Sequence, residues 1–188
     1  MEVEQVVLVD RFDRPIGSMP KHKVHRAQTP LHRGFSLFLF NHKGELLLQQ
    51  RSASKATWPL VWSNSCCGHP LPGEHYAEAV RRRVAYELGM TKCSLFEILP
   101  NYSYQAIKDG VMENEICPVW VGWSDEAPQL NDSEVNTIRW VAWSDFIGAI
   151  MNTKDNSFDD LSIWCLEEAA LLHDSEKFQD LWKEKMTF

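Results

Sequence analysis

Apolar runs in the first third of the chain predict a β-hairpin. Residues 35–40 (FSLFLF) are almost entirely apolar and are typical of a strand in the core. Residues 41–44 (NHKG) end in glycine, which supplies the dihedral angles of a tight turn. Residues 46–51 (LLLQQR) then form the returning strand.

Shorter apolar or alternating segments predict the remaining strands. They occupy residues 5–10, 61–67, 96–104 and 137–142, and a further strand begins at residue 113 and continues into an apolar run. Turn-forming residues at 13–17 and 108–110 separate some of these segments. The pattern predicts a sheet assembled from distant parts of the chain.

Helical spacing appears at four places. Ala77, Val80, Val84 and Leu88 recur on one face of a helix that Gly89 ends as a C′ residue. Residues 143–151 form a second helix, begun by Ser144 or Asp145, and residues 159–173 and 176–185 form two C-terminal helices. Strands mixed with helices in 188 residues predict one domain of the α/β (α+β) class.

Net charge restricts the class of partner. The formal charge of −7 argues against broad nucleic-acid binding. Basic residues still cluster at residues 21–33 and 81–83, and such islands suit a small anionic substrate or are solvated surface.

Cysteine usage and apolar run lengths restrict the location. Five cysteines with no repeating spacing make a disulfide framework improbable and favour a reducing compartment, so we expect a cytoplasmic protein. The acidic start MEVEQVV does not have the pattern of a signal peptide, and the sequence has no uninterrupted apolar run of about 18 residues, so no membrane span is expected.

Two pairs of residues are candidates for chemistry. Glu113 and Glu115 would share one face of a strand, where two carboxylates repel unless a cation lies between them or the strand edge is solvated. His25 and His32 are seven residues apart, and Pro30 interrupts any helix there, so they could converge only in a loop.

The stretch 58–90 resembles the Nudix box, a loop–helix–loop that holds metal against a diphosphate. The matching positions are Gly68, Glu74, Arg82, Glu87 and Gly89. Two acidic positions of the box are Arg83 and Tyr86 here, which argues against hydrolysis and leaves a scaffold that holds a diphosphate.

Several further segments resemble the type I isopentenyl-diphosphate isomerases, which have the Nudix fold. They are LHRGFSLFLF, LLLQQRSASK, WPLVWSNSCCGHP, YSYQ and ENEICPV, spread over roughly residues 20–140. The resemblance implies a Nudix-like mixed β-sheet sandwiched between helices, preceded by an N-terminal strand and a His-rich loop. The whole chain, 1–188, would be one such domain, with a core at about 31–148 and C-terminal helices at about 159–186.

The resemblance also implies a set of functional residues. One divalent metal, Mn²⁺, Mg²⁺ or Zn²⁺, would be bound by His25, His32, His69, Glu113 and Glu115. A second ion, Mg²⁺, would be held by Glu87 through the substrate diphosphate, and Lys21, Arg51, Lys55 and Arg83 would contact that diphosphate.

The family interconverts isopentenyl and dimethylallyl diphosphate, a small isoprenoid substrate, by moving one double bond. Cys67 would exchange a proton with C2, and Glu115 beside Tyr104 would supply or relay the other proton. Trp164 is the candidate that stabilises the tertiary cation. We expect a monomer or weak homodimer without nucleic-acid or membrane partners.

Two alternative functions remain at this point. A Nudix-type diphosphate hydrolase would need carboxylates where Arg83 and Tyr86 stand. A zinc-binding domain built from Cys66, Cys67 and His69 would need adjacent cysteines to hold one tetrahedral ion, which they do badly.

Overall fold

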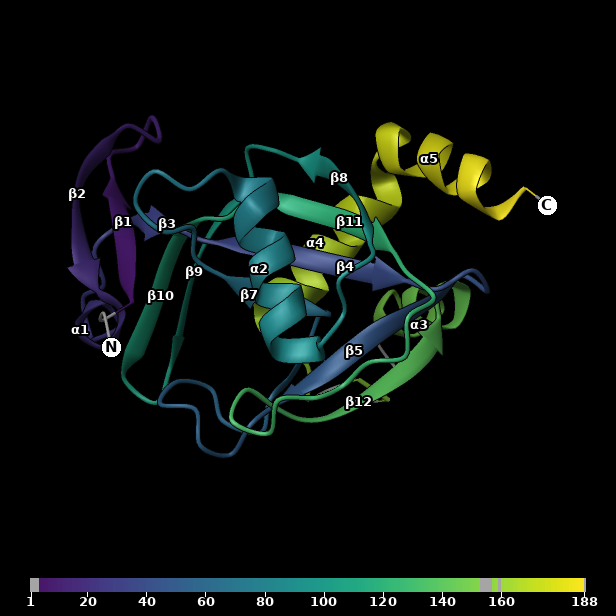
Figure 1. Ribbon diagram of the computed structural model, residues 1–188, viewed down its shortest axis with the longest axis horizontal. Helices are drawn as coiled ribbons and strands as arrows, with labels where there is room; N and C mark the ends of the chain where they lie inside the picture. Colours follow the sequence, from purple (N-terminus) through teal and green to yellow (C-terminus); the bar gives the residue numbers. More distant parts are fainter. Residues whose placement is uncertain (1–3, 153–156, 159, 188) are drawn as a thin grey trace.

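The computed structural model describes residues 4–152, 157–158 and 160–187 and places two β-sheets among helices (Figure 1). The larger sheet runs in the order β12 (Val135–Ala142), β5 (Glu45–Arg51), β4 (Phe35–Phe40), β11 (Val119–Trp123) and β8 (Ser94–Leu99). Two short strands join it, β6 (Trp62–Ser63) beside β5 and β7 (Cys66–Gly68) beside β4.

The smaller sheet is built from three strands within residues 5–33 and from one later hairpin. Its order is β2 (Pro15–Pro20), β1 (Gln5–Val9), β3 (His32–Arg33), β10 (Val111–Ile116) and β9 (Ser103–Lys108). The sequence predicted one mixed sheet, and the structure adds this smaller second sheet to it. The strand β3 has only two residues, too few to show a hydrophobic period.

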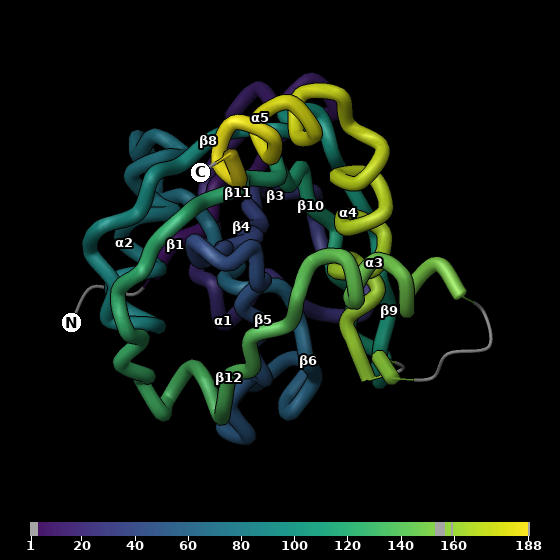
Figure 2. The backbone as a smooth tube through the Cα atoms, turned by 90° about the vertical axis from the view of Figure 1, so that its right-hand side faces the viewer, coloured from purple at the N-terminus to yellow at the C-terminus, as the bar shows by residue number. Residues whose placement is uncertain are grey.

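Helices cover the two faces of the larger sheet. The helix α2 (Tyr76–Leu88) lies on one face, and α3 (Trp143–Ile150), α4 (Ile163–Asp174) and α5 (Glu176–Met186) lie on the other (Figures 1 and 2). The arrangement confirms the predicted sheet between helices.

The strand β4 shows why both faces need cover. All six of its residues are buried, and alternate side chains enter different cores. Leu37 and Leu39 pack with Val80 and Val84 of α2, whereas Phe38 and Phe40 pack among the C-terminal helices. A strand that is buried on both sides has a nearly uninterrupted run of apolar residues in its sequence, as β4 does.

Several predicted boundaries are wrong. Residues 61–67 divide into β6 and β7, and residues 96–104 divide at a turn between β8 and β9. The predicted His-rich loop contains the one-turn helix α1 (Lys21–Val24) as well as β3. The helix α3 has Ala142 at its N-cap with no capping side chain, so neither Ser144 nor Asp145 begins it.

The helices near the C-terminus agree better with the sequence. The predicted start at Asp159 falls outside the described residues, and the structure begins α4 at Ile163, where the hydroxyl of Ser162 caps the helix. The box helix α2 ends at Gly89, whose φ of 65° is the left-handed value that glycine adopts easily.

Candidate active site

A pocket of about 470 Å³ contains nearly all of the predicted site residues. Its walls come from both sheets and from α2 and α4. Residues that line it include Lys21, His25, Arg51, Lys55, Cys67, His69, Arg83, Glu87, Tyr104, Glu113, Glu115 and Trp164. His32 is fully buried and does not line this pocket, but it lies beside Glu115.

Strand register in the smaller sheet aligns three of these side chains. Glu115 of β10 pairs with His32 of β3 on one side and with Tyr104 of β9 on the other. Directly opposed residues project from the same face of a sheet, so the three side chains form a row. Glu113 follows the same face two residues earlier, and a bridge between Arg26 and Met112 brings the preceding His25 beside it.

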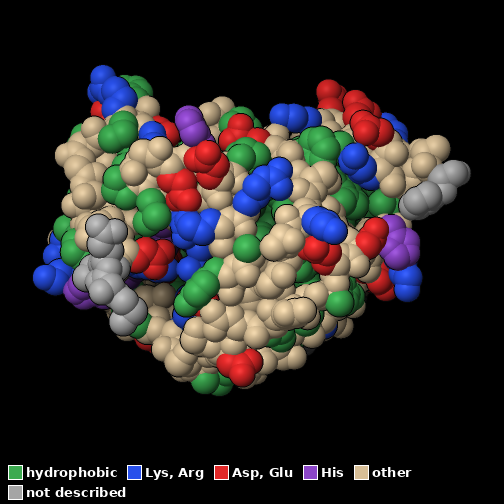
Figure 3. Space-filling model, viewed as in Figure 1, with side chains coloured by type: hydrophobic (Ala, Val, Ile, Leu, Met, Phe, Trp, Pro, Cys, Tyr) green, Lys and Arg blue, Asp and Glu red, His purple; other side chains and the backbone are tan. Residues whose placement is uncertain are grey.

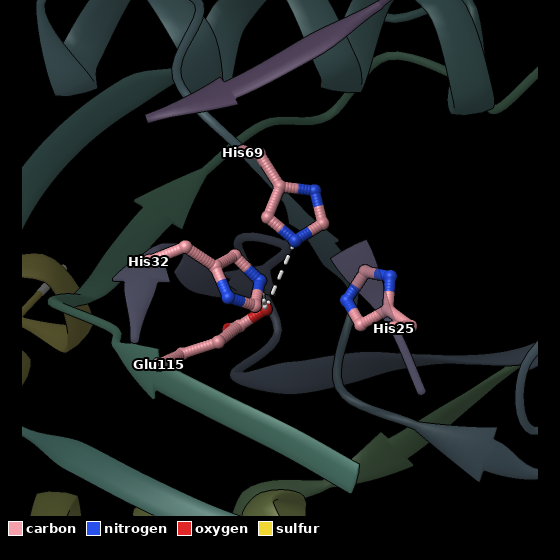
Figure 4. Close-up of side chains that lie close together, drawn as sticks. All are labelled: His25, His32, His69 and Glu115. Atoms are coloured by element: carbon pink, nitrogen blue, oxygen red, sulfur yellow. Dashed lines mark hydrogen bonds and ion pairs between the residues drawn. The ribbon is translucent and has the colours of Figure 1, made fainter. Parts of the chain in front are cut away.

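Three imidazoles and the Glu115 carboxylate therefore converge (Figure 4), and the Glu113 carboxylate joins them beside His25. The ring centroids of His25, His32 and His69 lie 5.2–5.5 Å apart. The Nε2 atoms of His32 and His69 lie 3.3 and 2.9 Å from Glu115 Oε1. On the other side of the cluster, His25 Nε2 lies 2.9 Å from Glu113 Oε2.

The donor set fits a divalent metal. One ligand atom from each of His25, His32, His69 and Glu115 lies within 4.8 Å of the others. The Nε2 atoms of His25 and His32 are buried and make no well-oriented hydrogen bond among the described residues. Buried imidazole nitrogens without a partner are costly, and a metal ion satisfies them.

Burial at His69 and hydrogen bonding at Glu115 favour the protonation states of these two residues that bind a cation. Burial lowers the pKa of His69 to about 3, despite the opposing effect of Glu115, so its imidazole is neutral. Burial would raise the pKa of Glu115, but hydrogen bonds from His32 and His69 hold it well below its usual range. Neutral imidazole and ionised carboxylate are the forms that bind metals.

Contacts made by residues of the box hold the loop that carries His69. Arg82 donates two hydrogen bonds to Glu74, at 2.7 and 2.8 Å, and a third to the carbonyl of His69 at 3.1 Å. Gly68 packs so closely that an added Cβ would lie 2.9 Å from Arg83 Cγ. The Glu74, Arg82 and Gly68 positions of the box therefore fix the loop rather than contact a metal.

The adjacent thiols point in different directions, as their alternation on a strand predicts. Cys66 is fully buried in the core under α2, whereas Cys67 lines the pocket. Cys67 donates a hydrogen bond to Asn64 Oδ1 at 3.2 Å, and its Sγ lies 3.6 Å from Ser36 Oγ. A zinc site that uses both thiols is thus excluded by geometry.

Aromatic rings form one wall beside Cys67. Trp164 is 3% exposed and donates its indole hydrogen to the same Asn64 Oδ1 at 3.2 Å. Its ring lies 5.0 Å from that of Trp58 and 5.7 Å from that of Tyr104. The hydroxyl of Tyr104 lies 3.5 Å from Glu115 Oε2, and burial raises the phenol pKa well above its usual range, which keeps the hydroxyl protonated.

The basic residues also line the pocket, and carboxylates neutralise most of them. Lys21 lies 3.0 Å from Glu4, and Lys55 contacts Glu134. Arg83 is buried and contacts Glu87 at 2.5 Å and Glu134 at 3.0 Å. Arg51 instead donates to the carbonyls of Trp58 and Thr57, at 3.0 and 2.9 Å.

Sequence reasoning missed several residues of this site. Glu4 and Glu134 lie far from the recognisable motifs and carry no signal of their own. Asn64 and Ser36 do lie within the motif segments, but nothing in the sequence distinguishes them from other small polar residues. Glu168 is an acidic residue on an otherwise apolar helix face, one turn after Trp164, which is a signal that periodicity could have shown.

Charged side chains elsewhere are dispersed. On the face seen in Figure 3, lysine and arginine side chains lie among acidic ones instead of forming one basic patch. In the part of the chain that the structure describes, no helix combines the length and apolar character needed to cross a membrane.

Comparisons with known proteins agree with this geometry. The NUDIX domain family matches residues 30–163. An isopentenyl-diphosphate Delta-isomerase of Saccharopolyspora erythraea is 44% identical over 171 residues, which cover 90% of this chain and 86% of the relative. The enzyme of the same name from Mycolicibacterium vanbaalenii is 48% identical over 74% of this chain and 78% of its own.

Solved structures extend the comparison to the fold alone. A protein from Deinococcus radiodurans superimposes with a TM-score of 0.69 at 22% identity, covering 89% of this chain and 98% of its own. The MutT protein from Methanosarcina mazei gives a TM-score of 0.60 at 21% identity, over 78% of this chain and 97% of its own.

Proposed function

The chain belongs to the isopentenyl-diphosphate Delta-isomerases of NUDIX fold, and from that premise we propose how its residues divide the reaction. It interconverts isopentenyl diphosphate and dimethylallyl diphosphate. The double bond moves when one carbon gains a proton and another loses one. The assignment of residues that follows rests on one observation: Cys67 and Glu115 enter a single pocket from different sheets.

Glu115 and Tyr104 act at C4 in this proposal. An unactivated alkene is a poor base, so protonation needs a positioned acid. Tyr104 keeps its proton and lies within reach of the Glu115 carboxylate. The pair can therefore deliver a proton to C4 in one direction and accept it in the other.

Cys67 acts at C2 and exchanges the second proton. Its thiol faces the pocket beside Trp164, so the two meet the same part of a bound substrate. The ring of Trp164 stabilises the tertiary cation by roughly 0.5–2 kcal/mol, as an aromatic face does when water is excluded.

His25, His32, His69, Glu113 and Glu115 would hold the divalent metal, which is Mn²⁺, Mg²⁺ or Zn²⁺. When bound, the ion supplies positive charge that keeps the cluster's carboxylates ionised and fixed in orientation. The orphaned imidazole nitrogens and the neutral state of His69 support the assignment.

The basic residues of the pocket bind the diphosphate. Lys21, Arg51, Lys55 and Arg83 supply four cations for a group that carries about three negative charges. Glu87 would hold Mg²⁺ on the diphosphate, and it already lines the pocket beside Arg83. Binding would exchange the present contacts with Glu4 and Glu134 for contacts with substrate.

Two residues of the box helix α2 argue against a hydrolase function. Arg83 occupies one of the acidic positions of the box and is buried against Glu87, so it cannot gather a metal. Tyr86, at the other position, is 52% exposed and stacks under the Arg83 guanidinium.

An incubation with substrate tests the division of roles. The purified protein should convert isopentenyl diphosphate to dimethylallyl diphosphate and release no phosphate from nucleotides. Glu115→Gln should abolish conversion, and Asn114→Ala, whose side chain binds Gln105 and the carbonyl of Thr29, serves as the neighbouring control. Full activity of folded Glu115→Gln would overturn the assignment.

We further propose that residues 1–188 act as one domain, as a monomer or weak homodimer in the cytoplasm, without nucleic-acid or membrane partners. All five cysteines are free thiols, which suits a reducing compartment. The dispersed surface charge supports the absence of a nucleic-acid partner. Gel filtration with light scattering would measure the oligomeric state.

A further inference from the structure

A carboxylate with no assigned role lies behind the thiol of Cys67. Glu168 belongs to α4, on the face of the larger sheet opposite α2 (Figure 2). It is fully buried, and neither carboxyl oxygen has a well-oriented hydrogen-bond partner among the described residues. An unpartnered buried carboxyl is costly, so its retention inside a core calls for a reason.

The hydroxyl of Ser36 connects this carboxyl to the pocket. Ser36 and Cys67 are paired residues on β4 and β7, with Oγ and Sγ 3.6 Å apart. The same hydroxyl lies 3.5 Å from Cys117 Sγ, and it lowers the pKa of the Glu168 carboxyl, which is buried one helical turn after the pocket residue Trp164. Ser36 therefore neighbours both the pocket thiol and the buried carboxyl.

The thiol needs help to act as a base. A thiol already carries one proton, so Cys67 cannot accept a proton from C2 without passing its own to another group. The hydroxyl of Ser36, 3.6 Å from the sulfur, is placed to take it.

We propose that Glu168 is the proton acceptor that lies behind Cys67 and that Ser36 relays the proton between them. This inference rests on the proposed role of Cys67 at C2. As the C2–H bond breaks, its proton binds Cys67 Sγ, and the original thiol proton passes to Ser36 Oγ. The original hydroxyl proton of Ser36 passes to the Glu168 carboxylate, which becomes a neutral acid while the cation becomes an alkene.

Every proton in this transfer comes from the protein or the substrate and ends on one of them. Cys67 and Ser36 end in the states in which they began, and the net change is one proton moved from C2 to Glu168. In the reverse reaction the neutral acid returns the proton by the same steps. The high pKa that burial gives Glu168 makes its carboxylate a stronger base than an exposed one.

Other titratable groups surround Glu168, but none of those described forms an ion pair with it. The titratable groups that face it are Cys67, Tyr102, Glu115, Cys117, Cys165 and Glu167. No lysine, arginine or histidine forms an ion pair with it within residues 4–152, 157–158 and 160–187. Glu167 is exposed and accepts a hydrogen bond from Tyr102, so it offers a matched neighbour without the buried position.

The first experiment compares Glu168→Gln with Glu167→Gln. Glu168→Gln keeps the shape of the side chain and removes a buried ionisable group, so it should fold with an unchanged or higher melting temperature. We expect kcat/KM to fall about 10²-fold or more in both directions, with little change in KM, because a positioned acid or base is worth about this factor. Glu167→Gln should retain activity.

A pH profile separates this role from a structural one. In the unaltered protein, kcat/KM for isopentenyl diphosphate should fall as the pH drops through the Glu168 pKa, because the protonated acid cannot accept a proton. That limb should be missing from the residual activity of Glu168→Gln. A structural role would lower activity equally at every pH.

A double-mutant cycle tests the relay itself. If Ser36 carries the proton to Glu168, Ser36→Ala combined with Glu168→Gln should be about as slow as the slower single variant. Multiplied losses would show that Glu168 acts independently of Ser36 and would overturn the relay. Full activity in Glu168→Gln, with Cys67→Ala inactive, would refute the inference while leaving the role of Cys67 intact.

Discussion

At the scale of single residues, the neighbouring thiols provide a matched comparison. Cys66 packs into the core under α2 and Cys67 faces the pocket, although the two have the same chemistry and adjacent positions. Burial raises the pKa of both, so the ionisation of the free thiol does not decide which one reacts. In the proposed mechanism, access to the substrate decides which thiol reacts.

We expect Cys67→Ala to lose roughly 10²–10⁴-fold in activity, the usual contribution of a positioned acid or base. Cys66→Ala should keep most activity and lose about 1 kcal/mol of unfolding free energy, because it leaves a small cavity. Steady-state kinetics and urea unfolding measure the two effects. An alkylating substrate analogue should label Cys67 and spare Cys66, and the opposite pattern of activities would reverse the assignment.

Glu87 allows a prediction about the second ion. Its carboxylate accepts hydrogen bonds from Arg83 and Gln49, and Arg83 keeps Glu134 as a second partner. Glu87→Gln should therefore lose about 1–3 kcal/mol of unfolding free energy and still fold. It should weaken Mg²⁺-dependent binding of the diphosphate while the imidazole cluster retains its metal.

Calorimetric titration with substrate, together with elemental analysis of the purified variant, distinguishes the two ions. Unchanged substrate affinity with loss of the cluster metal would mean that the two sites had been interchanged.

At the scale of elements, the short connection between β3 and β4 determines where the Glu115 carboxylate of the proposed metal cluster can lie. Gly34 lies under the Glu115 carboxylate, and a Cβ at this position would overlap it. The backbone must come this close because β3 pairs with β10 directly at Glu115.

Gly34→Ala should consequently displace Glu115 and reduce metal content and activity together by at least about tenfold, since displaced ligands and their supports cost 10–100-fold. Gly148→Ala in α3 is the matched control, because its Cβ would meet nothing within 4 Å. That change should gain about 0.5–1 kcal/mol of stability, as glycine disfavours a helix interior. Wild-type metal content in Gly34→Ala would contradict the packing argument.

The sequence predicts those elements whose own pattern is long enough to recognise. The apolar run of β4 and the stripe of α2 are two such patterns, and both match the structure closely. The two-residue strand β3 is invisible to any periodicity, since its place is set by pairing with β10 more than eighty residues later. The second sheet could not be predicted for that reason.

The residues of the candidate site also fall into two groups, those that the sequence predicts and those that only the tertiary structure reveals. His25, His32, His69, Glu113 and Glu115 belong to recognisable segments, and the structure brings them together. Their roles stay predictions. Glu4 and Glu134 neutralise the basic residues only through the tertiary fold, so sequence reasoning treated those cations as free.

At the scale of the whole molecule, the cluster joins segments that are far apart in the chain. We expect chelation to abolish isomerisation and Mn²⁺ or Mg²⁺ to restore it. Metal at a hundred times its dissociation constant adds about 2.7 kcal/mol of stability. For a domain of this size that corresponds to a melting temperature about 5–10 °C higher.

Scanning calorimetry with and without metal measures the shift, and an activity assay on the same samples measures the loss. Full activity in protein shown by elemental analysis to be free of metal would refute this prediction.

The pairing of β3 with β10 has a consequence for the order of events at the ribosome. Strand β1 pairs with β2 on one side and with β3 on the other, and β3 must wait for β10, which leaves the exit tunnel some eighty residues later. At a synthesis rate of about 5–20 residues per second, the N-terminal hairpin stays without its sheet for several seconds. Strands β1 and β2, although made before β10, are thus among the last to dock.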